Sequence, residues 1–324
     1  MIAMWDELFS ELAPGSGVAL EEGDGDRAFE AMHAVLDTVW SECVRLLADG
    51  GLICINVGDA VRTVSSRFAL YSNHARIAES LRALGLTLLP MIIWRKPTNA
   101  PNKFMGSGML PGGAYVTLEH EFIVIARKGP LRRGTTEAGR ARRRRSALFW
   151  EERNEWFSDV WRLAGARQSL GGTGARSRSA AFPLELPYRL VAMYSWQGDT
   201  VCDPFVGTGT TSLAAMALGR NSVGVDSSAA ILDEADHRIT DGGTAAALAQ
   251  LTERRLALHT DFVCERTEPP KHWNAPHGFP VVTSQETDLE LPRVARIEPT
   301  SDGRAERRYV VRYAENELRL VESE

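Results

Sequence analysis

The sequence predicts an α/β fold in which helices cover both faces of a sheet. Short apolar runs of strand length alternate along most of the chain with longer segments in which apolar residues recur at helical spacing. The strand runs are apolar almost throughout, which is typical of strands buried on both faces. One of these runs leads into a glycine-rich turn at 206–209, which a helical segment follows.

The elements of the first half are bounded by recognisable end signals. Residues 26–49 present one apolar helical face, and the glycines that follow tolerate the left-handed conformation that ends many helices. Asn73 can cap a later helix, which Gly85 ends. In order, the expected elements are a helix at 26–49, a strand at 52–57, a helix at 73–84, and strands at 86–94 and 122–126.

The second half changes composition before regular structure resumes. Residues 129–181 are rich in Arg, Gly and Ser, which predicts an insertion. Beyond about residue 260, short strand-like pieces such as 309–311 alternate with Pro and Gly breaks, which predicts a small β-rich extension. Between these parts we expect a helix at 184–194, a strand at 200–205, a helix at 210–218 and a strand at 222–225.

Length and composition place the chain among globular proteins. Its 324 residues, of which 44% are hydrophobic, can bury the core of one large domain with additions. The four cysteines are far apart and form no CxxC pair, so we predict neither a metal site nor disulfides. No apolar run approaches the roughly 20 residues of a membrane span, and the N-terminus lacks a basic secretory start. We therefore expect a cytoplasmic protein without a membrane partner.

Charge is distributed unevenly along the chain. The net charge of -5 does not by itself indicate a nucleic-acid partner. From Arg127 to Arg145, however, nine residues are Lys or Arg and only Glu137 is acidic. Such a strip can bind phosphate groups whatever the net charge, and the alternative is a solvated, disordered loop.

The most informative stretch runs from a strand through a glycine turn into a helix. Glycines let a ligand approach the backbone, and the free N–H groups at a helix start favour an anionic group such as a carboxylate. Asp203, at the strand end, can accept a hydrogen bond from an ammonium group. Asp226, 19 positions beyond Gly207 and at the end of the next strand, can bind both hydroxyls of a ribose. The stretch reads Asp203-Pro204-Phe205-Val206-Gly207-Thr208-Gly209-Thr210-Thr211.

An amino-acid end beside a ribose describes S-adenosyl-L-methionine, which we therefore predict as the cofactor. Two glycines after a strand also occur in many plain turns, so the turn alone is a weak signal. The Asp-Pro-Phe sequence before the glycines argues against a nicotinamide-dependent oxidoreductase, which is another use of such a sheet. The predicted cofactor contacts are Asp203, Pro204, Phe205, Gly207, Gly209, Thr210 and Asp226.

The string Asp-Pro-Phe-x-Gly-x-Gly-Thr-Thr at 203–211 resembles the cofactor motif of bacterial DNA amino-methyltransferases, the enzymes of restriction–modification systems. The segments 93–103 and 119–129 are similar to strands of the catalytic half of the same family. The resemblance covers most of residues 1–240. It implies a Rossmann-like, circularly permuted methyltransferase in which the catalytic strands precede the cofactor strands.

The same resemblance divides the chain into parts. Phe182 and Pro183 look like the segment that closes the methionine end of the cofactor pocket; a proline-started helix that packs on the sheet is the alternative. The implied parts are an N-terminally incomplete catalytic half at 1–128, a basic target-recognition insertion at 129–181, a cofactor-binding half at 182–245 and an extension at 246–324.

The catalytic motif that the resemblance implies does not occur in the printed sequence. It is a Ser/Asp/Asn-Pro-Pro-Tyr/Phe tetrapeptide, expected just before a segment like 1–9, which stacks on the flipped base and holds its exocyclic amine. Pro269-Pro270 is followed by Lys271 and lies in the wrong half. We therefore predict a few tens of residues ahead of Met1 that supply this motif and one central strand. Without that strand, two strands in the middle of the sheet would lack hydrogen-bond partners.

Candidate DNA contacts lie in the basic insertion and in the polar loop after Trp94. Trp150, Trp156 and Trp161 favour DNA binding, although we expect at least one of them to anchor the insertion to the core. Asp59 ends a strand on the ligand side, so it either faces the cofactor or base, or caps the next segment. The predicted DNA contacts are Lys103, Arg142, Arg143, Arg144 and Arg145.

The resemblance implies a site-specific methyltransferase that acts on double-stranded DNA. It transfers a methyl group from S-adenosyl-L-methionine to an exocyclic amine of a flipped base, with cytosine N4 as the expected target. Adenine N6 is the first alternative, and an inactive remnant that binds DNA or the cofactor is the second. A restriction endonuclease of the same system is the expected companion, with no direct contact implied.

Overall fold

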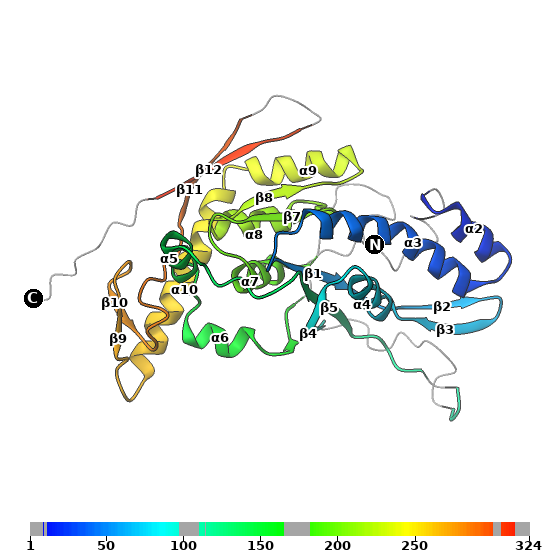
Figure 1. Ribbon diagram of the computed structural model, residues 1–324, viewed down its shortest axis with the longest axis horizontal. Coiled ribbons are helices and arrows are strands. Elements are labelled where there is room, and N and C mark those ends of the chain that lie inside the picture. The colour runs from blue at the N-terminus through cyan, green and yellow to red at the C-terminus, as the bar shows by residue number, and fades with distance from the viewer. Residues whose placement is uncertain are drawn as a thin grey trace, which may run out of the picture. The chain divides into compact units, whose positions relative to one another are not determined.

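The computed structural model describes residues 9, 12–96, 110–113, 115–164, 182–300 and 306–314 (Figure 1). The chain splits into two compact units, of which the first is Met1–Arg132 with Ser158–Pro183 and the second is Arg133–Phe157 with Leu184–Glu324. The insertion predicted at 129–181 is therefore divided between the two units.

The first unit is built on a four-stranded sheet, in the order β1 (Leu52–Val57), β5 (His120–Arg127), β4 (Thr87–Arg95) and β6 (Val160–Trp161). Strand β5 is antiparallel to both β1 and β4, and β6 is parallel to β4. Strands β1 and β4 therefore run in the same direction, and their carboxyl ends lie at the same end of the sheet.

Three helices belong to this unit: α2 (Pro14–Glu21), α3 (Gly25–Leu46) and α4 (Asn73–Ala83). Asp24 starts α3 by accepting a hydrogen bond from the backbone N–H of Arg27 (2.9 Å). Met32 and Leu36 of α3 and Ile77 of α4 pack in one core with one face of the sheet. Both helices predicted for this half are confirmed, whereas the sequence pattern does not predict α2.

A β-hairpin of β2 (Ala60–Val64) and β3 (Arg67–Tyr71) follows β1. The two residues of its turn, Ser65 and Ser66, both have positive φ (47° and 68°). Turns of this kind usually contain Asn or Gly, which tolerate that conformation. Because the Ser-Ser pair carries no such signal, the hairpin is not predicted from the sequence.

The opposite face of the sheet is deeply buried. Side chains alternate between the two faces of a strand, so Trp94, Ile123 and Ile125 point away from α3 and α4. These three side chains are at most 1% exposed. Trp94 also donates a hydrogen bond from Nε1 to the backbone oxygen of Leu163 (2.9 Å), which joins the segment after β6 to the sheet.

The second unit contains a two-stranded parallel sheet of β7 (Thr200–Asp203) and β8 (Asn221–Gly224). Three helices accompany it: α7 (Glu185–Tyr194), α8 (Thr210–Ala217) and α9 (Ala229–Thr240). Tyr188 of α7, Leu213 of α8 and Ile239 of α9 share one buried core. The predicted order of helix, strand, helix and strand from 184 to 225 is confirmed.

The extension after residue 245 contains more helix than the sequence predicts. Helix α10 (Thr244–Glu265) is 22 residues long. Two hairpins follow it, β9 (His272–Asn274) with β10 (Phe279–Val281) and β11 (Val294–Pro299) with β12 (Tyr309–Tyr313). The strands confirm the β-rich extension predicted beyond about residue 260, whereas the sequence pattern does not predict α10.

Two helices from the predicted insertion, α5 (Glu137–Arg145) and α6 (Trp150–Trp156), belong to the second unit. Buried Arg255 of α10 donates two hydrogen bonds to the carboxylate of Glu152 (2.5 and 2.7 Å). Burial alone would lower the pKa of Arg255, but the carboxylate of Glu152 raises it above its ordinary value. His259 bridges the Glu151 carboxylate (2.7 Å) and the backbone oxygen of Pro280 (3.0 Å), which fixes the first hairpin to both helices.

Within the described residues, β1 is hydrogen-bonded only to β5, and β7 only to β8. The further strand expected beside them stays a prediction. No helix in the described part of the chain is both long and apolar enough to cross a membrane.

Candidate functional site

The predicted cofactor motif forms one continuous structure in the second unit. Strand β7 ends at Asp203, the chain turns through 204–209, and α8 begins at Thr210. Because β8 is parallel to β7 with Gly224 opposite Asp203, the chain that leaves β8 passes beside the turn and brings Asp226 to it. The predicted contacts of this unit therefore lie close together at the carboxyl ends of the two strands.

Asp226 is tied to the turn by both carboxylate oxygens. Its Oδ2 accepts a hydrogen bond from the backbone N–H of Gly207 (3.2 Å), and its Oδ1 accepts one from the backbone N–H of Ser228 (2.9 Å). Each oxygen keeps a further lone pair, and the side chain is only half-buried. The carboxylate can therefore still accept hydrogen bonds from the hydroxyls of a ligand.

Asp203 keeps one oxygen available in the same way. Its Oδ1 accepts a hydrogen bond from the backbone N–H of Phe205 (3.0 Å), and its Oδ2 has no hydrogen-bond partner within the described ranges. The Phe205 side chain is 36% exposed, and Pro204 is half-buried. An ammonium group can reach the free oxygen of Asp203, with an exposed aromatic ring nearby.

The two glycines of the turn serve different purposes. Both have positive φ, 52° at Gly207 and 79° at Gly209. A Cβ at Gly209 would contact Ile239 and Ala235 of α9 at 3.4 and 3.5 Å, so helix packing also favours glycine there. A Cβ at Gly207 would meet nothing closer than 3.9 Å. Gly207 therefore faces open space, which leaves room for a ligand against the backbone.

Arg238 of α9 holds the turn from its other side and is a residue that the sequence analysis missed. Its Nη1 donates hydrogen bonds to the hydroxyls of Thr208 (3.3 Å) and Thr210 (2.8 Å). Burial lowers the pKa of Arg238. Since 28 residues separate it from Thr210, no local pattern could have linked Arg238 to the motif.

Phe182 and Pro183 lie just before Leu184, the N-cap of α7, and are half-buried. They belong to the first unit, whereas the glycine turn belongs to the second. Their contact with the cofactor stays a prediction.

A second group of polar residues lies in the first unit, at the carboxyl ends of β1 and β4. Asn56 donates a hydrogen bond from Nδ2 to Oε2 of Glu121 (2.6 Å), and Lys96 pairs with Oε1 of the same carboxylate. Asp59 accepts a hydrogen bond from the backbone N–H of His74 (3.2 Å) and contacts its Nδ1 (2.8 Å). Asp59 thus caps the start of α4 rather than the segment that follows it directly, and its predicted place beside the cofactor or the base stays a prediction.

The arginines predicted to contact DNA lie on α5, so this segment is a helix rather than a disordered loop. Two of them already have carboxylate partners. Arg142 pairs with Asp199 (3.0 Å), and Arg144 pairs with Asp288 (3.4 Å). These two ion pairs attach α5 to other parts of the second unit.

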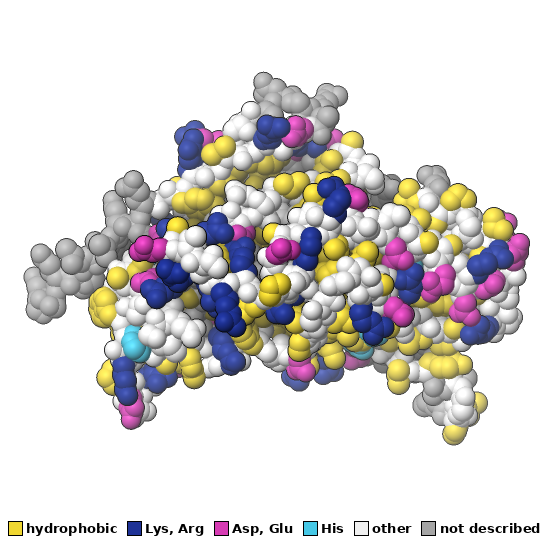
Figure 2. Space-filling view, in the orientation of Figure 1, with side chains coloured by type: hydrophobic (Ala, Val, Ile, Leu, Met, Phe, Trp, Pro, Cys, Tyr) yellow, Lys and Arg dark blue, Asp and Glu magenta, His cyan; other side chains and the backbone are white. Residues whose placement is uncertain are grey.

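The side chains of Arg143 and Arg145 are exposed and make no hydrogen bond or ion pair with described residues. Figure 2 shows Lys and Arg side chains gathered on the surface over α5. Lys103 lies outside the described residues. All five predicted DNA contacts stay predictions.

Two of the three tryptophans of the predicted insertion are buried. Trp156 is 5% exposed and Trp161 is 2% exposed, whereas Trp150 is 39% exposed. The expectation that at least one of them anchors its segment is confirmed.

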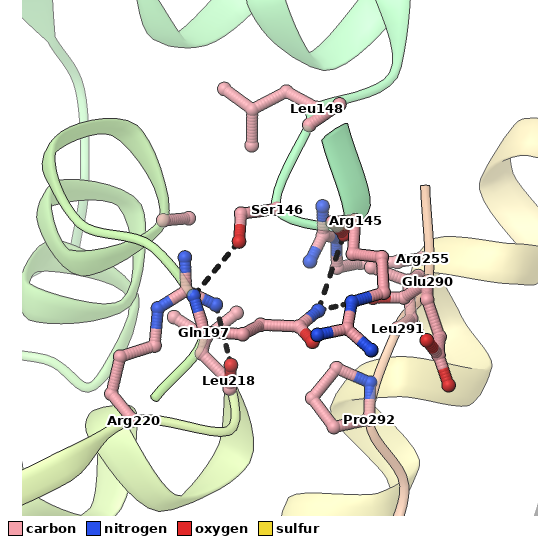
Figure 3. Close-up of a pocket in the computed structure, with 12 residues that line it drawn as sticks. Arg145, Ser146, Leu148, Gln197, Leu218, Arg220, Arg255, Glu290, Leu291 and Pro292 are labelled. Atoms are coloured by element: carbon pink, nitrogen blue, oxygen red, sulfur yellow. Dashed lines mark hydrogen bonds between the residues drawn. The ribbon is translucent and has the colours of Figure 1, made fainter. Parts of the chain in front are cut away.

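A small cavity in the second unit lies between the end of α5, the loop after α7 and the segment before β11 (Figure 3). Gln197 crosses it and donates from Nε2 to the backbone oxygens of Arg145 (3.2 Å) and Glu290 (2.6 Å). Arg220 beside it donates to the backbone oxygen of Ser195 (2.7 Å), and burial lowers the pKa of Arg220 to about 10. The cavity has room for about one water molecule, so it is too small for a nucleotide cofactor.

The sequence is similar to that of a known protein family and of several of its members. The sequence model of the DNA methylase family matches residues 15–237. The Type II methyltransferase M.MthZI of Methanothermobacter thermautotrophicus is 47% identical over 293 residues, which cover 90% of this chain and 81% of that protein. The Type II methyltransferase M.MjaI of Methanocaldococcus jannaschii is 43% identical over 237 residues, which cover 70% of this chain and 77% of that protein.

A solved structure supports the same relationship. TTHA0409 of Thermus thermophilus, a proposed DNA modification methylase crystallised with S-adenosyl-L-methionine, is 36% identical and superimposes with a TM-score of 0.53. The match covers 65% of this chain and 77% of that one.

The fold and the turn between Asp203 and Asp226 define a Rossmann-like methyltransferase domain. Since the family match spans more than half of the sequence and M.MthZI is closely similar, the chain belongs to the DNA methylase family of N6/N4 amino-methyltransferases.

Proposed function

We propose that this protein transfers a methyl group from S-adenosyl-L-methionine to N4 of cytosine in double-stranded DNA, as the modification enzyme of a restriction–modification system. One observation carries the proposal. The hydrogen bond from the backbone N–H of Gly207 to Asp226 brings that carboxylate to the glycine turn, beside the oxygen of Asp203 that has no partner among the described residues. The cofactor in TTHA0409 and the Type II methyltransferases among the relatives support it. The permuted order of the motifs supports cytosine N4, because the resembled subgroup includes many cytosine-N4 enzymes. A restriction endonuclease of the same system is the proposed companion, and the cytoplasm is the proposed location.

The residues of the turn fit this cofactor. Asp203 would accept a hydrogen bond from the amino group through its free Oδ2, and Asp226 would accept hydrogen bonds from the ribose hydroxyls. Gly207 leaves the space that a ligand against the backbone needs. When bound, the cofactor supplies an electrophilic methyl group on a sulfonium centre. The remaining proposed contacts are Pro204, Phe205, Gly209, Thr210, Phe182 and Pro183.

The basic helix α5 would contribute affinity for DNA. Arg143 and Arg145 are exposed without carboxylate partners among described residues, so each can neutralise a phosphate. Arg142 and Arg144 would first have to leave Asp199 and Asp288, and we expect smaller contributions from them. Lys103 is proposed as a further contact.

Methylation of an amine that is paired inside a duplex requires the base to leave the stack. The exocyclic nitrogen then needs hydrogen-bond acceptors for its two N–H groups, so that its lone pair points at the methyl group. Asp203 and Asp226 belong to the protein itself, so they would hold the cofactor whether or not DNA is bound.

Two measurements test the proposal. Calorimetry with S-adenosyl-L-methionine should show binding of the protein alone, and labelled methyl groups should then appear in DNA from an unmethylated genome. Nucleosides from that DNA should include N4-methylcytosine, whereas N6-methyladenine would move the target to the alternative base. Binding without transfer would support the inactive remnant instead, and absence of cofactor binding would contradict the proposal as a whole.

A further inference from the structure

Asn56 is the last residue but one of β1, on the sheet face that also carries Trp94 and Glu121. Its side-chain oxygen Oδ1 is buried and has no hydrogen-bond partner among the described residues. Buried carbonyl oxygens in folded proteins almost always accept a hydrogen bond, so an unpaired one needs an explanation. The position gives one, because ligands of α/β folds bind at the carboxyl ends of strands.

The amide of Asn56 is held in one orientation by charges. Its Nδ2 donates to Oε2 of Glu121 (2.6 Å), and Lys96 holds the other oxygen of that carboxylate. Turning the amide over would place Oδ1 against a negatively charged oxygen, which is strongly unfavourable. Glu121 and Lys96 are 18% and 31% exposed, so their ion pair is partly shielded from water. The unpaired oxygen is therefore a fixed feature of this end of the sheet.

The chemistry of this position selects a neutral N–H donor. Lys96 and Glu121 neutralise each other, and the available acceptor is an uncharged amide oxygen. A cationic ammonium group would prefer a free carboxylate, such as that of Asp203. Nδ2 of Asn56 carries a second hydrogen, so the amide offers an acceptor beside a donor. That pair matches an amino group next to a ring nitrogen, the arrangement that asparagine recognises in adenine.

We infer that Asn56, positioned by Glu121 and Lys96, accepts a hydrogen bond from the exocyclic amino group of a nucleobase. The inference rests on the proposed function, which brings two such groups to the protein: the amine of the flipped target base and the amine of the adenine in S-adenosyl-L-methionine. In either case the hydrogen bond to Asn56 favours a base that carries the amino group over one that lacks it. The experiment separates the two sources.

The test compares nucleosides that differ only in the amino group. Dissociation constants of the intact protein are measured by NMR titration for adenosine against purine riboside, and for cytidine against its analogue without the 4-amino group. At least one amino nucleoside should bind about fivefold more tightly than its partner, the value of one hydrogen bond. Asn56→Ala should bring that ratio close to one. Asn221→Ala, which changes an exposed asparagine at the start of β8, should leave it unchanged.

A second variant guards against misfolding of the first. In Glu121→Gln the new amide can donate a hydrogen bond to Oδ1 of Asn56 and occupy it. The affinity ratio between the amino and amino-free nucleosides should therefore fall, although Asn56 is retained and position 121 keeps a side chain of the same size. Repeating the titrations with saturating S-adenosyl-L-methionine assigns the source, because selectivity that persists belongs to the target base and selectivity that disappears belongs to the cofactor adenine. Equal binding of all pairs by the unaltered protein, or an unchanged ratio in folded Asn56→Ala, would overturn the inference. If only the proposed function is wrong, the protein should still bind amino nucleosides more tightly than their amino-free analogues but transfer no methyl group to DNA.

Discussion

Replacing Asp226 with alanine removes the carboxylate that joins the glycine turn to the chain after β8. In the proposed complex it also removes the acceptor of two ribose hydroxyls. A hydrogen bond to a charged group contributes about 1.5–3 kcal/mol. Because Asp226 is only half-buried, we take the lower value for each bond, which gives about 3 kcal/mol in total. At about 1.4 kcal/mol for each factor of ten, S-adenosyl-L-methionine should bind roughly 100-fold more weakly.

The assay is calorimetric titration of the folded variants with the cofactor. Asp226→Asn keeps one oxygen acceptor but loses the charge, so we expect an intermediate loss of about tenfold. Asp241→Ala is the matched control, because this exposed aspartate also accepts a backbone hydrogen bond from Gly243 (2.9 Å) in a turn but lies outside the motif. If the dissociation constant of Asp226→Ala for S-adenosyl-L-methionine stays within threefold of that of the unaltered protein, Asp226 does not bind the ribose.

Four further outcomes are expected. Gly207→Ala places a methyl group in open space at φ 52°, so the unfolding free energy should fall by only about 1 kcal/mol while cofactor affinity falls at least tenfold; equal affinity would show that no ligand approaches there. The double variant Arg143→Ala/Arg145→Ala should reduce the slope of log affinity for DNA against log salt by about 2, and an unchanged slope would remove both residues from the DNA contacts. Arg255→Met leaves a buried carboxylate unpaired, so the unfolding free energy should fall by about 3–5 kcal/mol in urea titrations, and a loss below 1 kcal/mol would contradict the role of the buried ion pair. Burial lowers the pKa of His277 to about 4, so the neutral form is the one that the fold favours, and its contribution is present above about pH 6.5 and lost as the pH falls toward 4. Between pH 6.5 and 4 the unfolding free energy of His277→Gln should therefore fall less than that of the unaltered protein. Identical falls in the two proteins would contradict a lowered pKa of His277.

The cofactor turn could be predicted because its determinants are local. Asp203, Gly207 and Gly209 stand within seven positions, and the strand, turn and helix signals follow one another directly. The position of Asp226 beside the turn could be predicted because only one helix and one strand lie between them. The hydrogen bond between Asp226 and Gly207 is the direct consequence of that spacing.

Helix α10 could not be predicted from its apolar pattern, because its buried face is partly polar. Thr252, Arg255 and His259 point into the protein, where an apolar periodicity would have had leucine or valine. Their partners come from distant segments: Arg255 bonds to Glu152, 103 residues away, and His259 bonds to Glu151, 108 residues away. Burial of these polar groups is possible only because tertiary structure supplies those acceptors.

The polar group around Asn56 was missed for a related reason. Asn56 and Glu121 are 65 residues apart, and only the antiparallel register of β1 and β5 brings them together. In the sequence, Asn56 is one polar residue at the end of an apolar run, which any strand end could show. Long-range strand pairing therefore assembles groups of polar side chains that local patterns do not reveal.

The most direct measurement uses S-adenosyl-L-methionine with a deuterated methyl group, incubated with the protein and duplex DNA from an unmethylated genome. Mass spectrometry of the released nucleosides identifies both the base and the nitrogen or carbon that carries the label. We expect label on N4 of cytosine with the unaltered protein and strongly reduced label with Asp226→Ala. Label on a ring carbon, or no label from a protein that binds the cofactor tightly, would contradict an amino-methyltransferase whose cofactor lies at the turn between Asp203 and Asp226.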